Sequence, residues 1–276
     1  MPLFTKNIEY NSPLKLSGWR KIAIGTWNTV GDPSVYGAID LDCENVVKMI
    51  EKLRAETGVK ITLTHAVGKV IAHTIRKHPE INCILRFGRL YPRKTVDIFF
   101  QVAADSQGED LSGAVIRNAD QKSVVDIARE LEERAQLIRA KKDHSYIKIK
   151  SLAKRLPGFL ASTLLNIGSL IMYKLNIWSP LLGSPRDSFG SIMVTSIGSL
   201  GMDEAYGPLV PYSHVPAVIA VGALVEKPVV RNGQIVIGKI IRICATFDHR
   251  LIDGIHGSKM AKTIKAVFQN PEQFLL

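Results

Sequence analysis

A β-hairpin signal close to the C-terminal end limits the folds that this chain can adopt. The tripeptide Arg231-Asn232-Gly233 is a strong turn signal, and the strand that returns from it runs from Ile235 to Phe247. A terminal helix from about Ile255 to Gln269 follows, and Asn270-Pro271 ends it. The helix directs its apolar residues inward, namely Met260, Ala261, Ile264, Val267 and Phe268. The chain therefore needs a sheet that pairs with the long strand and a layer of helices beside it.

The remaining pattern mixes helices and strands in no regular order. Apolar spacing predicts helices from Cys43 to Thr57, from an N-cap at Thr62 to a stop at Pro79, and from Val124 to Ile138. Short apolar runs predict strands at 35–41, 96–104, 114–117, 191–196 and 215–221. Because no regular βαβ alternation is present, an α+β fold, a two-layer sandwich of a mixed sheet and packed helices, is favoured over a doubly wound sheet.

Composition restricts the compartment and the class of protein. A chain of 276 residues can bury a large core in one domain or in two fused halves. The three cysteines, Cys43, Cys83 and Cys244, have no CxxC spacing, so they predict neither a disulfide framework nor a zinc site, and Cys244 is expected in the core. The start of the chain lacks a secretory signal, so we expect a cytoplasmic protein that is not exported.

The formal net charge of +11 is compatible with three kinds of anionic partner. These are nucleic acid, anionic lipid and a polyanionic small molecule such as coenzyme A. Lysines and arginines are spread along the chain without interleaved aromatics, and no nucleic-acid motif is present, so we expect no nucleic-acid partner. His65, His73 and His78 show no metal spacing with carboxylates, so we expect no metal.

One segment, residues 151–183, does not fit an ordinary globular pattern. From Leu156 to Tyr173 it has 18 residues without a charge, which reaches the length at which a membrane span must be considered. Pro157, Gly158 and Lys174 interrupt or bound the run. We interpret the segment as an apolar helical insertion. A span, a helix buried in a subunit contact and a surface that faces a membrane or a substrate all remain open.

The candidate for chemistry is the string Asp248-His249-Arg250-Leu251-Ile252-Asp253-Gly254 between the long strand and the terminal helix. A histidine can remove a proton from a thiol or hydroxyl at neutral pH because its reference pKa is about 6.5. A lone histidine is more often a capping or hydrogen-bonded structural residue. The acid four residues later and the glycine that permits a tight turn are poorly explained by packing alone.

The whole string resembles the HxxxDG motif, in full DHRxxDG, of the dihydrolipoamide acyltransferase catalytic domains, whose core is similar to that of the chloramphenicol acetyltransferases. Residues 115–123 are similar to the family segment after its central strand, and residues 193–201 to the family's TISNxGxxG stretch. Trp19-Arg20-Lys21 resembles the basic start of the domain. The resemblance covers residues 18–276 and implies a chloramphenicol acetyltransferase-like fold, with residues 1–17 as an N-terminal arm.

The resemblance also implies roles for particular residues. His249 would be the general base that takes the proton from the thiol of coenzyme A or from another acceptor. Thr195 would donate its hydroxyl to the developing oxyanion, a contact worth about 3 kcal/mol in comparable sites. Asp253 would form an ion pair with Arg20 that fixes the turn of the histidine. Ser196, Gly198 and Ser199 would contact coenzyme A, although Thr195 and Gly198 also suit a strand edge and a turn.

The family implies a homotrimer with active sites at the subunit interfaces, and coenzyme A or acyl-CoA as substrate. We expect the chain to lack the family's lipoyl domain before the catalytic region, so that an acyl carrier or lipoyl protein would act in trans. Its segment 104–110 also differs, which leaves the identity of the acyl acceptor open.

Three functions remain in competition: a CoA-dependent acyltransferase, a small-molecule O-acetyltransferase, and a non-catalytic trimeric core of a dehydrogenase complex. Residues 151–183 allow an association with a membrane surface.

Overall fold

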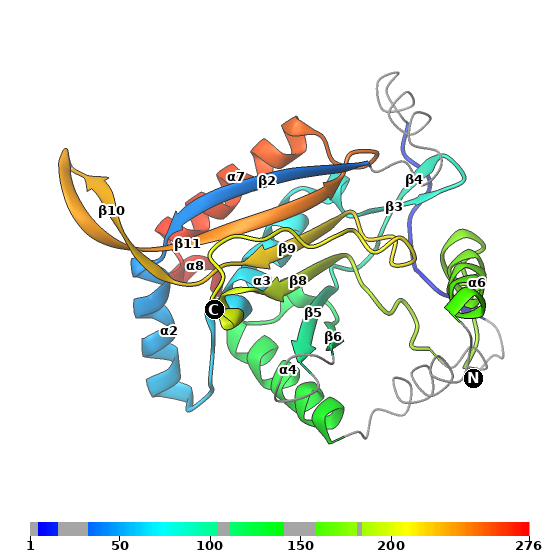
Figure 1. Cartoon of the computed structure of the whole chain (residues 1–276), viewed down its shortest axis with the longest axis horizontal. Coiled ribbons are helices and arrows are strands. Elements are labelled where there is room, and N and C mark those ends of the chain that lie inside the picture. Colours follow the sequence, from blue (N-terminus) through cyan, green and yellow to red (C-terminus); the bar gives the residue numbers. More distant parts are fainter. Residues whose placement is uncertain (1–4, 16–32, 104–110, 141–157, 181–183, 276) are drawn as a thin grey trace.

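The computed structural model describes residues 5–15, 33–103, 111–140, 158–180 and 184–275 (Figure 1). Arg20 and the segment 104–110, to which the sequence assigns roles, lie outside these ranges. Seven of the described strands form one sheet, in the order β10-β11-β9-β8-β5-β6 with β2 paired to β11. They are β2 (Ser34–Asp42), β5 (Ile98–Ala103), β6 (Leu111–Ile116), β8 (Ile192–Ser196), β9 (Ala217–Val221), β10 (Val225–Arg231) and β11 (Gln234–Asp248).

The sheet is mixed, as the sequence predicts. Strand β8 runs parallel to both β5 and β9, whereas the other pairs in the sheet are antiparallel. The predicted strands 96–104, 114–117, 191–196 and 215–221 correspond to β5, β6, β8 and β9 within a few residues. Strand β11 is the longest because its first half pairs with β10 and its second half with β2 and β9 on its two edges.

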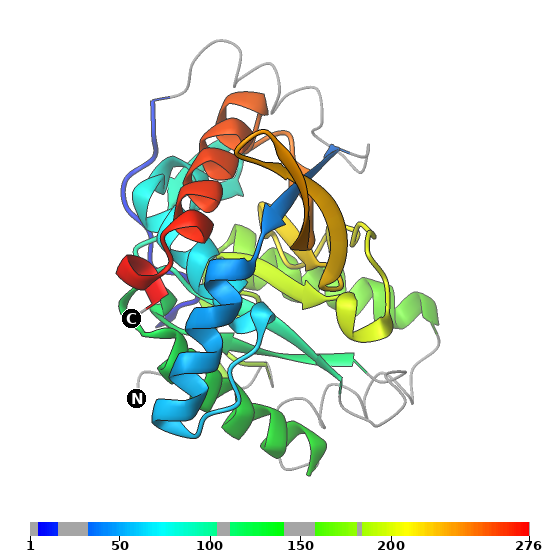
Figure 2. The ribbon, with the colours of Figure 1, turned by 90° about the vertical axis from the view of Figure 1, so that its left-hand side faces the viewer.

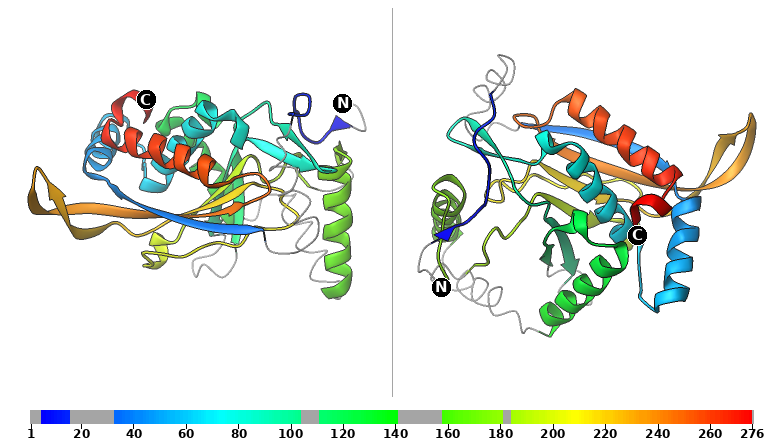
Figure 3. Two further views of the ribbon diagram at one scale, coloured as in Figure 1. Left: turned by 90° about the horizontal axis from the view of Figure 1, so that it is seen from above. Right: turned by 180° about the vertical axis from the view of Figure 1, so that it is seen from behind.

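Helices cover one face of the sheet, which confirms the two-layer α+β architecture (Figures 2 and 3). The helical layer contains α2 (Glu44–Thr57), α3 (Leu63–Lys77), α4 (Val124–Arg139), α7 (Gly254–Gln269) and the short α8 (Glu272–Leu275). Single 3-10 turns lie at η1 (Pro79–Ile81), η2 (Ala119–Gln121) and η5 (Gly198–Leu200). Helix α3 is the most buried of the four long helices, because nine of its fifteen residues, 66–72, Thr74 and Ile75, lose nearly all contact with solvent.

The ends of the helices follow the chemistry of their sequence. Thr62 accepts a hydrogen bond from the backbone N–H of His65, whose ring accepts one from the N–H of Thr62, so α3 begins with a reciprocal cap. Gly58 ends α2 in the left-handed conformation at φ 68°. In α7 the inward residues are Met260, Ile264, Val267 and Phe268 as predicted, but Thr263 is buried where Ala261 was expected, and Ala261 stays partly exposed.

Part of the other face of the sheet packs against Phe189, Leu209 and Val210. Phe99, Val115, Met193, Val215 and Val218 form a separate apolar cluster there. Residues of β8 alternate between the two faces, since Ile192 and Val194 join the core beneath the helices whereas Met193 joins this second cluster. Thr195 therefore belongs to the face that lies away from the helices.

The predicted hairpin is present as β10 and β11, and its outer part projects from the body of the molecule (Figure 1). Asn232 and Gly233 occupy the turn with φ of 52° and 78°, the left-handed values that a two-residue hairpin loop requires. Val230 pairs with Ile235, and Pro228 pairs with Ile237. Val230, Ile235 and Ile237 are each at least 73% exposed, which leaves an uncovered apolar stripe on the arm.

A smaller part of the molecule lies at the opposite end from this hairpin. It contains β1 (Thr5–Lys6) paired with β7 (Ile177–Trp178), the hairpin β3 (Cys83–Arg86) and β4 (Arg89–Pro92), α6 (Gly158–Ser169) and the π-helix η3 (Leu170–Lys174). The β3–β4 hairpin was not predicted, because its strands have only four residues each and its tip places Phe87 at φ 45°. Within the described ranges, no helix has both the length and the apolar character needed to cross a bilayer.

Candidate active site

The string from Asp248 to Gly254 forms a compact turn between β11 and α7. The carbonyl of Asp248 accepts hydrogen bonds from the N–H groups of Leu251 and Ile252, both at 2.9 Å. Its buried carboxylate accepts from the backbone N–H of Arg250 at 3.0 Å and from the guanidinium of Arg250 at 2.6 Å. The backbone of His249 donates to the carbonyl of Pro33 at 2.8 Å. The turn is therefore held at both ends and has little freedom to move the imidazole.

The hydrogen bond of His249 determines which ring nitrogen can act as a base. Nδ1 lies 3.1 Å from the carbonyl oxygen of Ile252. A carbonyl oxygen can only accept, so Nδ1 carries the hydrogen and the neutral ring keeps its lone pair on Nε2. Half-buried and oriented in this way, the imidazole has the tautomer that a general base acting through Nε2 requires.

Asp253 begins helix α7. Its Oδ1 accepts hydrogen bonds from the backbone N–H groups of Ile255 and His256, at 3.1 and 3.2 Å, and lies 2.6 Å from Nδ1 of His256. This is a helix N-cap with a reciprocal side chain at the third helical position. The expected partner Arg20 lies outside the described residues, so the Arg20–Asp253 ion pair stays a prediction.

Thr195 lies in the last part of β8, opposite Ala220 of β9, and is partly buried. Ile197, Ala220 and Cys244 form an apolar cluster on the same face, so Cys244 is a core residue as predicted. Burial raises the pKa of the Cys244 thiol, which keeps it protonated near neutral pH.

The residues after Thr195 make a tight turn. Ser199 is exposed and donates its hydroxyl to the carbonyl of Ser196 at 2.9 Å. A Cβ atom on Gly198 would lie 2.5 Å from the carbonyl oxygen of Gly222, so only glycine fits there. Gly201 ends the turn at φ 76°. Close packing accounts for Gly198 and the left-handed backbone accounts for Gly201. Contact with coenzyme A at Ser196, Gly198 and Ser199 stays a prediction.

The sheet register keeps Thr195 and His249 apart within one chain. Thr195 is level with Ala220, and Ala220 is level with Cys244, four residues before the end of β11. Four residues of strand extend about 13 Å, and two strand spacings add about 10 Å sideways, so Thr195 and the start of the turn are roughly 16 Å apart. Two side chains that act on one reacting carbonyl must lie within about 3 Å of neighbouring atoms. One chain therefore carries two separate halves of the expected site.

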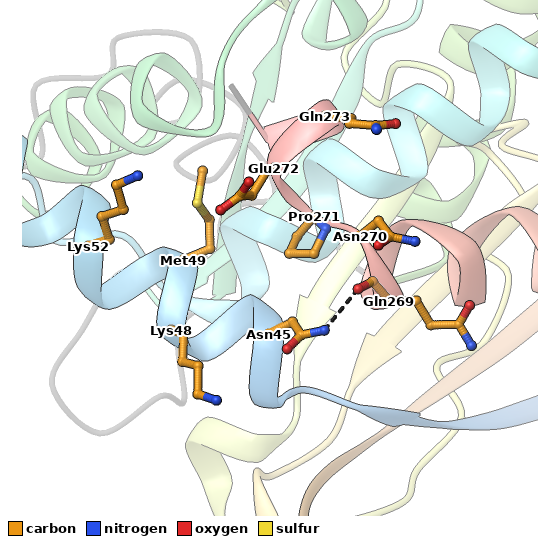
Figure 4. A pocket seen from close by; sticks show the side chains of 9 residues that line it. All are labelled: Asn45, Lys48, Met49, Lys52, Gln269, Asn270, Pro271, Glu272 and Gln273. Carbon is orange, nitrogen blue, oxygen red and sulfur yellow. Dashed lines mark hydrogen bonds between the residues drawn. The ribbon is translucent and has the colours of Figure 1, made fainter.

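Neither of two cavities lined by described residues joins these halves. The larger, about 390 Å³, lies between α2 and the end of α7, where Asn45 donates to the carbonyl of Gln269 at 2.8 Å (Figure 4). Helix α7 has 16 residues, so this cavity lies about 24 Å from the turn that carries His249. The smaller, about 220 Å³, lies between β2, β11 and α7, and Ile252 and Asp253 are part of its wall.

A polar contact that the sequence did not predict lies on the other side of the turn. His214 Nε2 lies 2.7 Å from the hydroxyl of Ser169, and its ring stacks on Tyr173 with centroids 5.0 Å apart. Burial lowers the pKa of His214 to about 4, so the ring is neutral at pH 7. Two residues later, Pro216 accepts a hydrogen bond from the N–H of Asp248. The predicted insertion is thus fixed beside the chain that supports the turn of His249.

The other histidines have structural environments. His65 caps α3, and burial lowers its pKa to about 4. His78 lies 3.0 Å from the hydroxyl of Thr263 and links α3 to α7. His73 packs on the ring of Phe274. Among the described residues, no group of three or more acidic, histidine or cysteine side chains is arranged to hold a metal ion.

Comparison with known proteins gives one family. The sequence model of the family described as 2-oxoacid dehydrogenases acyltransferase (catalytic domain) matches residues 14–145 and 186–276. The segment between the two matched parts, residues 146–185, contains the whole of the insertion predicted from the sequence, 151–183. Both halves of the expected site, Thr195 and His249, lie in the matched part.

Curated relatives agree with that family. The chain is 27% identical over 274 residues to the dihydrolipoyllysine-residue acetyltransferase component of the pyruvate dehydrogenase complex of Bacillus subtilis, covering 95% of this chain and 51% of the relative. It is 25% identical over 231 residues to the component of the same name from Staphylococcus epidermidis, covering 83% of this chain and 43% of the relative. The chain thus spans about half the length of the curated relatives it matches.

Solved structures share the fold. The dihydrolipoamide acetyltransferase of Azotobacter vinelandii, studied for the role of a serine, a histidine and an asparagine in its catalytic mechanism, matches with a TM-score of 0.66 and 20% identity, over 97% of this chain and 96% of that chain. A probable dihydrolipoamide acetyltransferase from Listeria monocytogenes matches with a TM-score of 0.63 and 22% identity, over 94% of each chain. At these identities the likeness concerns the fold.

Proposed function

Because the chain belongs to the family of 2-oxoacid dehydrogenase acyltransferase catalytic domains, we propose that it transfers acyl groups between coenzyme A and a second thiol. The relatives are named for acetyl transfer on a dihydrolipoyllysine residue, so a dihydrolipoyl thiol on a carrier protein is the first candidate for the partner thiol. Residues 18–276 form the catalytic domain in this proposal. The observation that carries it is the tautomer of His249, whose Nδ1 is occupied by the carbonyl of Ile252.

The reaction proceeds by proton transfer and thioester exchange. His249 Nε2 takes the proton from the attacking thiol, and the sulfur forms a bond with the carbonyl carbon of the thioester. The carbonyl electrons move onto its oxygen, and the Thr195 hydroxyl donates a hydrogen bond to this oxyanion. The tetrahedral intermediate then collapses and breaks the original C–S bond. The leaving thiolate takes the proton back from the imidazolium, so the chain ends the cycle unchanged.

The spacing of the candidate residues supports this assignment. In the A. vinelandii protein, the histidine and the asparagine named for the mechanism are four residues apart. His249 and Asp253 are also four residues apart in this chain, with aspartate in place of asparagine. Thr195 carries a hydroxyl, as does the serine named for the mechanism of that protein. In our proposal Asp253 positions the turn through its cap on α7 and through the predicted ion pair with Arg20.

The separation of the half-sites supports a shared active site. We propose that Thr195 of one subunit meets His249 of its neighbour in a homotrimer. The apolar stripe on the projecting hairpin, where Ile235 and Ile237 are exposed, is a surface that such an assembly would bury.

A cytoplasmic location agrees with the three cysteines, which are all buried and joined by no disulfide in the described chain.

An acyl-CoA panel tests the proposed activity. Each acyl-CoA is incubated with the protein and dihydrolipoamide, and release of the coenzyme A thiol is followed. We expect turnover that His249→Ala lowers by about 100-fold to 10,000-fold, the usual contribution of a positioned base. His73→Ala is the matched control and retains the activity, because His73 lies on α3 and packs on Phe274.

The same assay separates the competing functions. Turnover that survives His249→Ala would refute the mechanism. If a panel of small alcohols and amines were acylated instead of dihydrolipoamide, the protein would be a small-molecule acyltransferase. Release of no coenzyme A from any donor would leave the non-catalytic core as the function.

A further inference from the structure

The smaller of the two cavities lies directly beside the turn that carries His249. It has a volume of about 220 Å³ and lies between β2, β11 and α7. Ile252, whose carbonyl oxygen lies 3.1 Å from Nδ1 of His249, forms part of its wall. The residue that orients the proposed base therefore also bounds this cavity, which we call the α7 cavity.

One face of the sheet leads from His249 into the α7 cavity. Along β11 the cavity is lined by Phe247, Ala245 and Ile243. Alternate residues of a strand share a face, and the N–H of His249 donates to the carbonyl of Pro33, so the pairing of β11 with the β2 side extends to this residue. His249 is thus the next position in the same row, and two residues of strand separate it from Phe247 by about 7 Å.

Small residues on both sides of the α7 cavity leave its space open. On the sheet, Gly37 of β2 is paired with Ala245 of β11. On α7, Gly257 and Ala261 line the same cavity. Neither glycine has a left-handed backbone, and a Cβ atom on Gly257 would meet no atom within 4 Å. Because the backbone does not require glycine at either position, the effect of these residues is to keep volume empty.

The α7 cavity is apolar, and it opens toward the turn. Among the residues that line it, Asp253 carries the one charge, and this residue caps α7. Ile243 and Ile264 lie along the cavity away from the turn and are only 3% and 4% exposed. Val35, which is paired with Phe247, is 40% exposed, and Gly254 at the start of α7 is exposed too. A cavity that is apolar inside and open beside the proposed base suits a hydrocarbon chain attached to the reacting carbonyl.

We propose that the α7 cavity binds the acyl chain of the acyl-CoA donor, and that the protein prefers straight acyl groups of medium length to acetyl. An apolar cavity of about 150 Å³ holds benzene, with its six carbons, so about 220 Å³ has room for roughly six to nine carbons. An acetyl group held at Nε2 of His249 ends before the cavity begins, whereas a longer chain reaches past Phe247. The inference rests on the acyl transfer proposed above and names its substrate class.

Binding of acyl-CoAs to the full chain, without an acceptor thiol, tests the proposal apart from turnover. Isothermal titration calorimetry compares acetyl-, butyryl-, hexanoyl-, octanoyl- and dodecanoyl-CoA. Each buried CH₂ group strengthens binding by roughly fourfold. We expect hexanoyl- and octanoyl-CoA to bind at least about tenfold more tightly than acetyl-CoA. Dodecanoyl-CoA should gain nothing further, because Ile243 and Ile264 are part of the buried wall.

Two substitutions fill the α7 cavity from opposite sides. Gly37→Val in β2 and Ala261→Leu in α7 should each lower the preference for octanoyl-CoA over acetyl-CoA by about tenfold or more. A Cβ atom on Gly37 meets only the ring of Phe247, at an ordinary 3.6 Å, so the sheet accepts a side chain there. Ala266→Leu is the matched control, since Ala266 is exposed on α7 and is not part of the wall. It keeps the wild-type preference, and circular dichroism checks that each variant is folded.

The outcomes separate this inference from the proposed function. Equal affinity for all chain lengths overturns the inference, as does a preference that both filling variants leave unchanged. If octanoyl-CoA binds tightly and no acceptor is acylated, the proposed function fails and the acyl-binding cavity stands. If acyl transfer to dihydrolipoamide shows no preference for chain length, the function stands and the α7 cavity is a packing gap.

Discussion

Mixing two variants that we expect to be inactive tests the proposed division of the active site between subunits. The sheet register places Thr195 roughly 16 Å from the start of the turn that carries His249, whereas both groups must lie within about 3 Å of the reacting atoms. A chain with Thr195→Ala keeps its base, and a chain with His249→Ala keeps its hydroxyl. Each variant alone lacks one half in every site.

Random assembly sets the size of the expected recovery. In a ring where each site takes its base from one subunit and its hydroxyl from the next, a one-to-one mixture gives an intact site with a probability of one half times one half. We therefore expect about one quarter of wild-type turnover per site in the unselected co-expressed population. Every trimer that contains both variants has one intact site out of three, so mixed trimers isolated through both tags should show about one third. Purified assemblies mixed without subunit exchange should stay at the level of the parents.

The assay is coenzyme A release by co-expressed, differently tagged chains isolated through both tags. Native mass spectrometry confirms that mixed assemblies have formed. If mixed assemblies show only the sum of the parental activities at every ratio, the two residues do not share a site between subunits. The register argument would then fail, even if each single variant were inactive.

Four further predictions follow from the described contacts. Thr195→Ala should lower kcat by about 100-fold while Thr195→Ser retains most of it, as measured by steady-state kinetics, since only the serine keeps a hydroxyl donor. Asp253→Ala should reduce the free energy of unfolding by about 1 kcal/mol through loss of the α7 cap, and Asp253→Asn by less, as measured by urea denaturation. Folding favours the neutral ring of His214, so the unfolded chain binds more protons than the folded chain between pH 6.5 and about 4. The free energy of unfolding should therefore fall as the pH drops through this window, by at most about 3 kcal/mol from this group. His214→Gln should make this fall smaller, as measured by denaturation curves at several pH values. Ile235→Asp should lower the mass of the assembly in light scattering without lowering the melting temperature, because this side chain is exposed on the hairpin.

Local sequence chemistry predicted most helices and strands. The N-cap at Thr62, the left-handed Gly58 and the Asn232-Gly233 turn are decided by a few neighbouring residues, and the structure has each of them. The string around His249 was recognisable because its residues are adjacent in the chain. The β3–β4 hairpin gave no comparable signal, because strands of four residues leave too few positions for a period to emerge.

Contacts between distant segments could not be obtained from the sequence. Ser169 and His214 are 45 residues apart and meet only because the insertion packs beside the loop before β9. The separation of Thr195 from His249 depends on the register of three strands. A pattern of apolar residues predicts which face of a strand is buried, but it does not predict which residues of the adjacent strand lie opposite. The resemblance to a family supplied the two roles, but the geometry of one chain was needed to see that they lie apart.

If the site is divided between subunits, activity depends on assembly even when each separate subunit stays folded. The proposed base is held by local bonds within each chain, since Ile252 orients the ring of His249 and Asp248 closes the turn. Thr195 is held just as locally in β8. A separated subunit would therefore keep both groups in their correct orientation and still lack a complete site. Dilution below the dissociation constant of the assembly should abolish turnover while circular dichroism is unchanged, and activity should return on concentration at a rate that depends on protein concentration. If turnover per chain stayed constant on dilution to isolated subunits, the base and the oxyanion donor would have to come from one chain, and Thr195 could not be that donor.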